Sequence, residues 1–431
     1  MNDGDAVAAP LDDAAFDAGL AACGIAAPDG PVGLAVSGGP DSMALAALAA
    51  GWGARNAVAV RAYTVDHGLR AQSAEEARAV KARCAALGLT ARVLTWRGDK
   101  PVSGVQAAAR AARYRLLYAA ARTDGAGAVL TGHSLDDQAE TVFMRLGRGA
   151  GPRGLAAMAA RSAIAVGAGP PIILARPLLA YPRRRLEAVV TARGVPVVHD
   201  PSNADPAFER VRARALLAAL AEQNLLTARG LARVADGARA AAAAENRAIA
   251  AAFRDAGGVF MRWGGATLAA SALDAPEAGP LIASLAVAAG PGARPTREAA
   301  ERAAAALREQ GAATLAGVLF TRRGGRIVAE REPAAAHGRA DGAPPIAAVS
   351  IAPGAARVWD ARVIVRNERA AAVVAGPLGQ DGPAGRAASP AIRAADGALL
   401  AAPALCRAAA GVTVSSLAAE RFEGGVLRFD D

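Results

Sequence analysis

The stretch between residues 31 and 145 alternates between short apolar runs and longer segments with helical spacing. The short runs cover 32–36, 57–65, 91–96 and 126–131. The longer Ala/Leu/Arg segments cover 42–50, 74–87, 105–122 and 135–145. Such alternation is typical of βα units. It therefore predicts an α/β fold whose N-terminal part is a Rossmann-like parallel sheet with helices on both faces.

Polar residues stand where these predicted strands end. Ser37 follows the first run, Asp66 follows the second, and Thr131 and His133 lie at the end of the fourth. Ligands of open α/β sheets bind beyond the carboxyl ends of the strands. We therefore expect these side chains to face one crevice.

The remainder of the chain divides by composition. Residues 220 to 310 are almost continuously Ala, Leu, Glu and Arg at helical spacing, which predicts a helical domain. Residues 331–345 are rich in Ala, Gly and Pro and lack periodicity, as linkers do. Alternating stretches such as "ARVWDARVIVRNE" then predict a small mixed α/β C-terminal domain. The expected units are 1–218, 219–330, a linker at 331–345, and 346–431.

Composition narrows the class of protein. The net charge of +10 favours a polyanionic partner such as nucleic acid. No run of about 18 apolar residues occurs, and the acidic start lacks the pattern of a secretory signal. Cys23, Cys84 and Cys406 are far apart, without the paired spacing of a zinc or iron–sulfur site. We therefore expect a cytoplasmic protein with no membrane segment.

The first predicted strand leads into the loop "SGGPDS". Gly38 and Gly39 let backbone N–H groups approach an anion, and Ser37 and Ser42 add hydroxyl donors. The following helix points its positive end at the same place. The loop lacks both the Gly-Lys-Ser/Thr ending of kinase-type loops and the dinucleotide G-x-G-x-x-G pattern. Asp41 suits such a loop when a divalent cation bridges it to phosphate. The alternative is an ordinary strand-to-helix turn with a serine cap.

The predicted helix "GVQAAARAARYRLLYAAA" carries an arginine face. Arg110, Arg113 and Tyr114 are three to four residues apart and lie on one side. Guanidinium groups bind phosphate bidentately, so this face predicts an anion site in the crevice. A solvated basic helix surface is the alternative.

A histidine and several carboxylates cluster in "TGHSLDDQAET". His133, Asp136, Asp137 and Glu140 follow the fourth strand and open a helix. Stabilisation of the helix dipole alone would favour some of these acids. Their number and their place beside the phosphate loop indicate binding of Mg²⁺ or of a cationic substrate.

These motifs together resemble a known family. "SGGPDS" resembles the signature of the ATP pyrophosphatases, also called the PP-loop superfamily. With "DHGLR", "QAAARAARY", "GHSLDDQAET", "MRLGRGAG", "RPLL" and "DPSNADPAF", the chain resembles the tRNA(Ile)-lysidine synthases from about residue 31 to 220. The resemblance implies a PP-loop catalytic domain at 1–218, followed by two domains that contact tRNA.

The resemblance also implies a two-step reaction. ATP adenylates the C2 oxygen of the wobble cytidine in the CAU anticodon of tRNA(Ile). The ε-amino group of free L-lysine then displaces AMP, which gives lysidine, AMP and pyrophosphate. The expected cofactors are ATP and Mg²⁺, and a homodimer is one oligomeric state open to such an enzyme.

Residue roles follow from the same resemblance. Asp41 would hold Mg²⁺, and Asp137 and Glu140 would hold the lysine ammonium. The expected catalytic residues are Asp41, Arg113, His133, Asp137 and Glu140. ATP would be bound by Ser37, Gly38, Gly39, Pro40, Asp41, Ser42, Asp66 and His67. The tRNA backbone would be contacted by Arg145, Arg148, Arg184, Arg210, Arg212 and Arg214, with Arg153, Arg183 and Arg185 beside them in the sequence.

Three positions depart from the family pattern. Ser134 stands where many members have a second histidine, and His199 stands where an aromatic residue is frequent. Val211 replaces an asparagine between arginines, which puts in doubt the polar contacts of that segment.

Rival functions fit the sequence less well. A tRNA thiolase needs a persulfide cysteine or a cluster, and an amidotransferase-type synthetase needs a nucleophilic cysteine near the start of a glutaminase domain; Cys23, Cys84 and Cys406 suit neither. A non-catalytic tRNA- or nucleotide-binding module has little reason to keep carboxylates in a phosphate crevice, where they repel the ligand.

Overall fold

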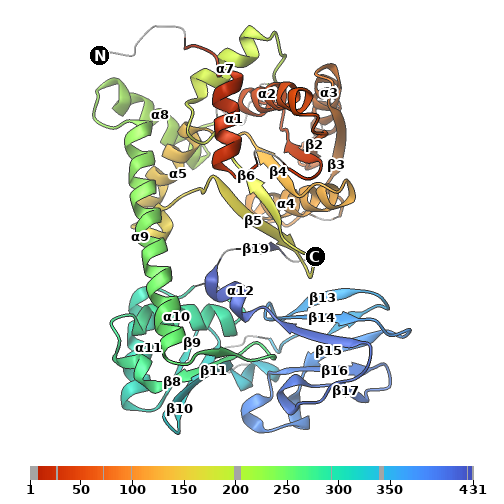
Figure 1. Cartoon of the computed structure of the whole chain (residues 1–431), viewed down its shortest axis with the longest axis vertical. Coiled ribbons are helices and arrows are strands. Elements are labelled where there is room, and N and C mark those ends of the chain that lie inside the picture. Colours follow the sequence, from red (N-terminus) through yellow and green to blue (C-terminus); the bar gives the residue numbers. More distant parts are fainter. Residues whose placement is uncertain are drawn as a thin grey trace.

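A seven-stranded sheet organises the N-terminal part of the chain (Figure 1). The computed structural model describes residues 8–25, 28–70, 72–98, 100–198, 205–292, 294–338, 344–424 and 426–429. The strands are β1 Val32–Ala35, β2 Val60–Asp66, β3 Thr90–Thr95, β4 Ala128–Thr131, β5 Arg161–Val166, β6 Ile172–Ala175 and β19 Val426–Phe429. Their order is β19-β5-β6-β4-β1-β2-β3, and only the β5–β6 pair is antiparallel. The four predicted strands and the α/β fold class are confirmed.

Helices cover both faces of this sheet, as predicted. One face carries α1 Asp13–Ala22, α2 Pro40–Asn56, α3 Ser73–Ala86 and α7 Arg183–Ala192. The other face carries α4 Val105–Thr123. Alternate residues of β1 separate the two cores: Leu34 packs with α2, whereas Ala35 packs beneath α4 with Tyr63. Both faces of β1 are therefore buried, which explains its uninterrupted apolar sequence.

A long helix leads from the sheet into the rest of the molecule. After α5 Leu135–Gly147, α6 Pro152–Leu155 and α8 Glu209–Glu222, the chain forms the 28-residue helix α9 Ala228–Asp255. Leu231 and Ala235 of α9 pack against Ala139 and Val142 of α5. The far end of α9 reaches the second half of the chain (Figure 1).

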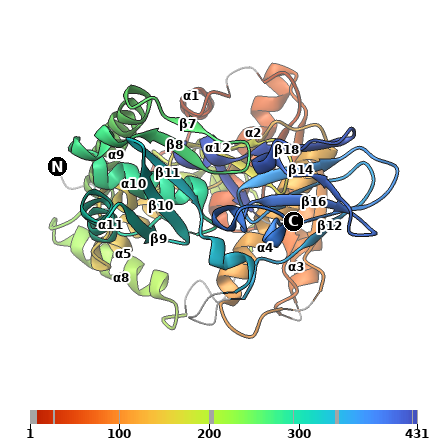
Figure 2. The same cartoon turned by 90° about the horizontal axis from the view of Figure 1, so that it is seen from below.

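The region expected to be mostly helical also contains a sheet. Beside α10 Ala278–Ala289 and α11 Arg297–Glu309 lies a five-stranded antiparallel sheet (Figure 2). Its strands are β7 Val259–Phe260, β8 Ala266–Ala269, β9 Ala312–Leu315, β10 Val318–Arg323 and β11 Arg326–Arg331. These strands are short and rich in Ala and Arg, so their period-2 pattern is weak and the helical pattern around them prevails.

Two small antiparallel sheets make up most of the C-terminal region. One contains β12 Val349–Ile351, β15 Val373–Pro377, β16 Pro390–Ala394 and β17 Leu399–Ala401. The other contains β13 Ala356–Trp359, β14 Val363–Asn367 and β18 Val412–Ser416. In the expected linker, Ala335 and Ala336 are buried, and residues 339–343 lie outside the described residues.

The end of the chain departs from the expected domain boundary. After α12 Ala418–Glu423, strand β19 leaves the C-terminal sheets and joins the first sheet next to β5. In the part of the chain that the structure describes, no helix combines the length and apolar character needed to cross a membrane.

Candidate active site

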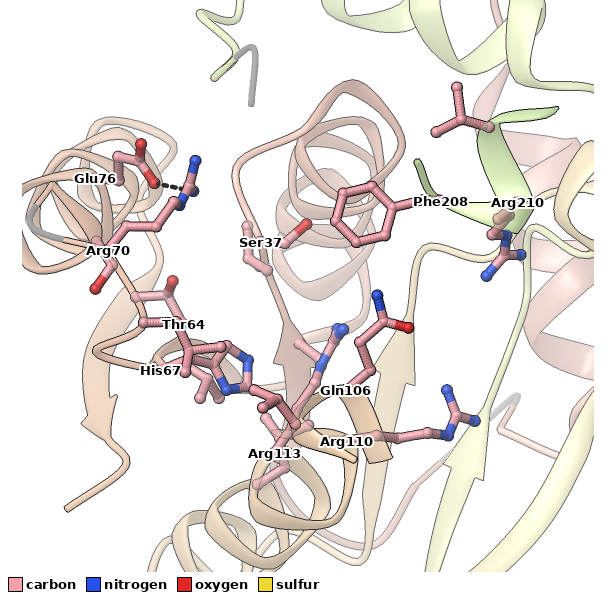
Figure 3. A pocket seen from close by; sticks show the side chains of 18 of the residues that line it. Ser37, Thr64, His67, Arg70, Glu76, Gln106, Arg110, Arg113, Phe208 and Arg210 are labelled. Atoms are coloured by element: carbon pink, nitrogen blue, oxygen red, sulfur yellow. Dashed lines mark hydrogen bonds and ion pairs between the residues drawn. The ribbon is translucent and has the colours of Figure 1, made fainter. Parts of the chain in front are cut away.

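A cavity of about 1190 Å³ lies beyond the carboxyl ends of β1 and β2 (Figure 3). Its walls come from these strands and from α3, α4, α5 and α8. Ser37 and His67 line it, as the sequence predicts for residues that follow the strands. Asp66 instead makes contacts within its own loop, where its Oδ1 accepts hydrogen bonds from the Gly68 N–H, at 2.9 Å, and the Ser73 hydroxyl, at 2.5 Å. Asp66 therefore shapes the loop that carries His67.

The predicted phosphate loop joins β1 to α2. Gly38 has φ of +92°, and a Cβ there would lie 2.6 Å from Val80 Cγ2, so this position requires glycine. A Cβ at Gly39 would meet nothing within 4 Å. The Ser42 hydroxyl accepts hydrogen bonds from the N–H groups of Ser37, at 3.1 Å, and Gly38, at 3.0 Å. Ser42 thus holds the loop in shape.

The N-terminus of α2 is open toward an anion. Its N-cap is Gly39 and its first residue is Pro40, and no side chain caps it. The first-turn N–H groups therefore keep their capacity to bind phosphate, and the helix dipole adds a favourable field. The loop has the geometry of an anion site in addition to that of a strand-to-helix turn.

The arginine face of α4 points into the cavity, as predicted. Gln106, Arg110 and Arg113 line it from one helix (Figure 3). Within the described residues, neither Arg110 nor Arg113 has a hydrogen bond or an ion pair; Arg110 stands over the Tyr114 ring, 5.0 Å from its centroid. Burial lowers the pKa of the Arg113 guanidinium. We call Arg110 and Arg113 the arginine wall of the cavity. Because these two cations have no acidic partners among the described residues, the wall attracts a polyanion.

Both predicted histidines are shifted toward the neutral form. Burial, together with surrounding arginines such as Arg176, lowers the pKa of His133 to about 3. Its Nδ1 lies 2.8 Å from the Thr131 hydroxyl. Burial and the charge of Arg113 lower the pKa of His67, whose Nδ1 has no hydrogen-bond partner. At neutral pH His133 is therefore suited to hydrogen bonding, not to proton donation as an imidazolium.

Three predicted carboxylates meet beside the cavity, on the Arg183 guanidinium. Arg183 Nε lies 3.0 Å from Asp41 Oδ2, and its Nη2 lies 3.0 Å from Asp137 Oδ1. Its Nη1 lies 3.5 Å from Glu140 Oε1. The side chain of Glu140 is only 2% exposed. We define Asp41, Asp137 and Glu140 as the carboxylate cluster.

Two arginines of α8 close this cluster from the cavity side. Arg210 Nε lies 2.6 Å from Glu140 Oε2, and its Nη2 lies 3.1 Å from Asp137 Oδ1. Arg214 Nε lies 2.8 Å from Glu140 Oε1. Both arginines also line the cavity. The sequence predicts that both contact the tRNA backbone, a prediction that the structure does not test; here they pair with the carboxylates expected to hold an ammonium group.

Asp41 has the features of a cation ligand. Burial raises its pKa to about 6, against the opposing effect of Arg183. Its Oδ1 is buried without a hydrogen-bond partner. No group of three or more His, Cys, Asp or Glu that could hold a metal occurs among the described residues. Mg²⁺ usually takes one or two carboxylates plus substrate phosphates, so the lone Asp41 oxygen beside the phosphate loop fits it.

Neighbouring residues explain how the cluster is held. Ser134 caps α5: its N–H and hydroxyl donate to Asp137 Oδ2, at 2.9 and 3.1 Å. This capping box shows what the serine at position 134 does. Asp136 accepts a hydrogen bond from the Arg183 N–H at 2.7 Å. Asp136 therefore fixes the start of α7, a role that spacing along one helix could not reveal.

The remaining predicted tRNA contacts surround the cavity or lie on the surface. Arg145 and Arg148 line it; Arg145 donates to the Gly154 carbonyl, and Arg148 pairs with Glu209. Arg212 is exposed and donates to carbonyls of the loop before α8, and Arg184 is exposed at the start of α7. Val211 lines the cavity, whereas His199 and the "DPSN" motif lie outside the described residues.

The sheet, the open loop and the arginine wall together form a site suited to a phosphorylated ligand. Residues 19–220 match the family described as the PP-loop domain. The chain is 54% identical over 215 residues to tRNA(Ile)-lysidine synthase of Rhodopseudomonas palustris, covering 49% of this chain and 60% of that protein. It is 52% identical over 220 residues to tRNA(Ile)-lysidine synthase of Bradyrhizobium sp., covering 51% and 60%.

These relatives confirm the resemblance expected from the motifs. The chain spans about 60% of the length of the curated relatives it matches. Among solved structures, the U34-tRNA thiolase NcsA from Methanococcus maripaludis is similar with a TM-score of 0.43 and 16% identity, covering 52% of this chain and 77% of that chain.

Proposed function

We propose that this protein is an ATP-dependent ligase that joins free L-lysine to C2 of the wobble cytidine in tRNA(Ile) with a CAU anticodon. The observation that carries the proposal is that two sites, one for an anion and one for a cation, adjoin the same cavity. An arginine wall and a phosphate loop suit ATP, and a carboxylate cluster next to them suits a cationic amine. The names of the relatives supply the substrate.

Adenylation uses the groups that bind the phosphates of ATP. The N–H groups at the start of α2 hold the pyrophosphate, and Arg110 and Arg113 offset the charge that develops on the phosphates. Asp41 would hold Mg²⁺, which when bound supplies further charge neutralisation. His133, neutral at pH 7, contacts the nucleotide or the adenylate by hydrogen bonding.

Ligation uses the carboxylate cluster. The lysine ammonium replaces the guanidinium groups of Arg210 and Arg214 on Asp137 and Glu140. One of these carboxylates takes a proton, so that the neutral ε-amine attacks C2 and AMP departs. Arg183 stays in place and holds the two carboxylates in a common orientation.

The rival functions receive less support. None of the three cysteines, all of them described, lines the cavity: Cys23 and Cys84 are buried, and Cys406 lies in the C-terminal region. This argues against a thiolase. A non-catalytic module that binds tRNA or nucleotide would not need a buried carboxylate pair beside an anion site. The proposal includes a cytoplasmic location. A homodimer is one candidate for the oligomeric state, which light scattering tests.

The test is incubation with a CAU-anticodon tRNA(Ile) transcript, ATP, Mg²⁺ and lysine, followed by mass spectrometry of the nucleosides. We expect lysidine and one AMP per modified tRNA. Asp137→Asn keeps the size of the side chain and is expected to reduce lysidine formation by about a thousandfold. The matched control is Asp236→Asn, an exposed carboxylate of α9 outside the cluster. Tight tRNA binding without AMP release would instead support the binding module, and an active Asp137→Asn enzyme would refute the residue assignment.

A further inference from the structure

The last described strand of the chain belongs to the active-site sheet. β19 runs parallel to β5 and forms the edge of the seven-stranded sheet, with Phe429 opposite Val166. The Gly167 N–H donates to the Phe429 carbonyl at 2.8 Å. In Figure 1 this strand lies between the N-terminal sheet and the sheets of the C-terminal region. Residues 426–429 thus add a strand to the sheet on which the cavity is built.

The Arg428 guanidinium anchors this strand to α12 on one side and to the loop after β5 on the other. Its Nε and Nη2 pair with the two carboxylate oxygens of Glu420 on α12, at 2.9 and 2.8 Å. Its Nη1 donates to the carbonyls of Gly167, at 2.5 Å, and Gly169, at 3.1 Å. A bidentate ion pair with two further hydrogen bonds holds β19 in register on β5. The position of Phe429 is thereby fixed.

Phe429 packs against α4, the helix that carries Arg110 and Arg113. Its ring stacks on the ring of Tyr114, with centroids 5.2 Å apart and an interplanar angle of 20°. Tyr114 is buried and is the same ring over which Arg110 stands at 5.0 Å. Arg113 is the preceding residue of α4 and lines the cavity with Arg110 (Figure 3). Phe429, Tyr114 and Arg110 thus form a continuous path from the C-terminal strand to the cavity.

We propose that β19 is a positioning element of the active site: Phe429 fixes the Tyr114 ring, and through it the Arg110 guanidinium and the turn of α4 that carries Arg113. This inference rests on the proposed function, because it takes Arg110 and Arg113 to be ATP-phosphate ligands. Tyr114 provides the one contact described for the Arg110 guanidinium. A long arginine side chain without such a platform samples many rotamers, and ordering it on binding costs affinity.

The pair Phe429→Ala and Leu427→Ala tests the proposal. Leu427 lies on the same strand, is 53% exposed and, by strand alternation, shares the face of Phe429 but not its stacking partner. The readouts are the Kd for ATP by equilibrium dialysis, the KM for ATP and for lysine, and the melting temperature. We expect Phe429→Ala to raise the Kd and the KM for ATP about three- to tenfold, leaving the KM for lysine unchanged. Leu427→Ala should leave all three constants unchanged.

Rescue and failure are distinguished by further measurements. Phe429→Tyr retains the stacked ring and should restore ATP affinity; if Phe429→Ala does not fold, Phe429→Leu, which keeps apolar volume but not the aromatic face, takes its place. A lower melting temperature with unchanged ATP affinity, or equal weakening by Leu427→Ala, would overturn the proposal. ATP binding requires neither tRNA nor lysine, so a chain that binds ATP in this Phe429-dependent manner without making lysidine would refute the proposed function and support the positioning role.

Discussion

The arginine wall and the carboxylate cluster adjoin one cavity but differ in how their charges are compensated. Arg110 and Arg113 have no acidic partner among the described residues. In the carboxylate cluster, by contrast, Glu140 is contacted through both of its oxygens by guanidinium groups. The wall is therefore ready for an anion, whereas the cluster already holds cations supplied by the chain itself.

The difference follows from the cost of burying charge. A nearly inaccessible carboxylate such as Glu140 would take up a proton or destabilise the fold if it had no counterion. Arg183, Arg210 and Arg214 supply that counterion when no substrate amine is present. Arg113 of the arginine wall has no such partner among the described residues, and burial lowers the pKa of its guanidinium. We infer that ATP binds to a preformed site, and that lysine binds by exchange with arginines.

Among the changes that bear on this comparison, removing a charge of the wall should have the largest effect. Arg113→Gln should lower the rate of tRNA-dependent adenylation by about a hundredfold, because one donor to the developing phosphate charge is lost. ATP–pyrophosphate exchange measures this step without lysine. Arg113→Lys keeps the charge but loses the planar fork, and should recover only part of the rate. Arg122→Gln, at the exposed end of the same helix, is the control; a fall as large in that variant would break the comparison.

A smaller effect concerns Asp41, which lies between the two sides. Its pKa of about 6 in the folded protein exceeds the ordinary value of 3.8, so the folded state holds this proton more tightly than the unfolded chain. The resulting stabilisation is present below about pH 4 and is lost as the pH rises to about 6. Relative to the wild type, Asp41→Asn should therefore gain about 2 kcal/mol in the free energy of unfolding between pH 4 and pH 8.

Denaturant unfolding at several pH values checks this sign. If the free energies of unfolding of the two proteins changed in parallel with pH, the pKa of Asp41 would not be raised in the folded state. The activity should depend on pH in the opposite direction to the stability. ATP consumption should fall as the pH drops below about 6, because a neutral Asp41 no longer attracts a cation.

The smallest expected effect sharpens the idea of exchange. Arg214→Gln removes one of the guanidinium groups that compete for Glu140, while Arg183 and Arg210 still neutralise it. The KM for lysine should fall about threefold, because Glu140 keeps two guanidinium partners and the Arg214 end of the lost pair is 42% exposed, which limits its contribution to about 1 kcal/mol. Arg212→Gln, two residues away and bonded to loop carbonyls, should leave the KM unchanged. A higher KM in Arg214→Gln would mean that this arginine helps to bind lysine.

Much of the site could be predicted because it depends on local order along the chain. Parallel strands bring their carboxyl ends together, so the loop after β1 and the acids after β4 had to be neighbours. Arg110 and Arg113 share a helix face by spacing alone. The contacts that Asp66 makes could not be predicted, because its hydrogen bond to Ser73 depends on how the loop after β2 folds back.

The partners of the carboxylates could not be predicted. Arg183, Arg210 and Arg214 lie 43 to 74 residues from Glu140, and many exposed arginines in this chain have similar neighbours in sequence. Which of them reaches the cluster is decided by the packing of α7 and α8. The sequence offers one general indication of such partners: carboxylates that become buried need cations nearby to compensate their charge.

By itself, then, the sequence determined the βα order, the phosphate loop and the choice of charged residues at the strand ends, since these follow from periodicity and from short spacing. Only the tertiary structure decided that arginines occupy the carboxylate cluster and that a strand from the far end of the chain completes the sheet beneath the arginine wall. The physical reason is that ion pairing and the addition of an edge strand depend on which segments come together in space, and a four-residue strand such as β19 carries too little pattern to specify its partner in advance.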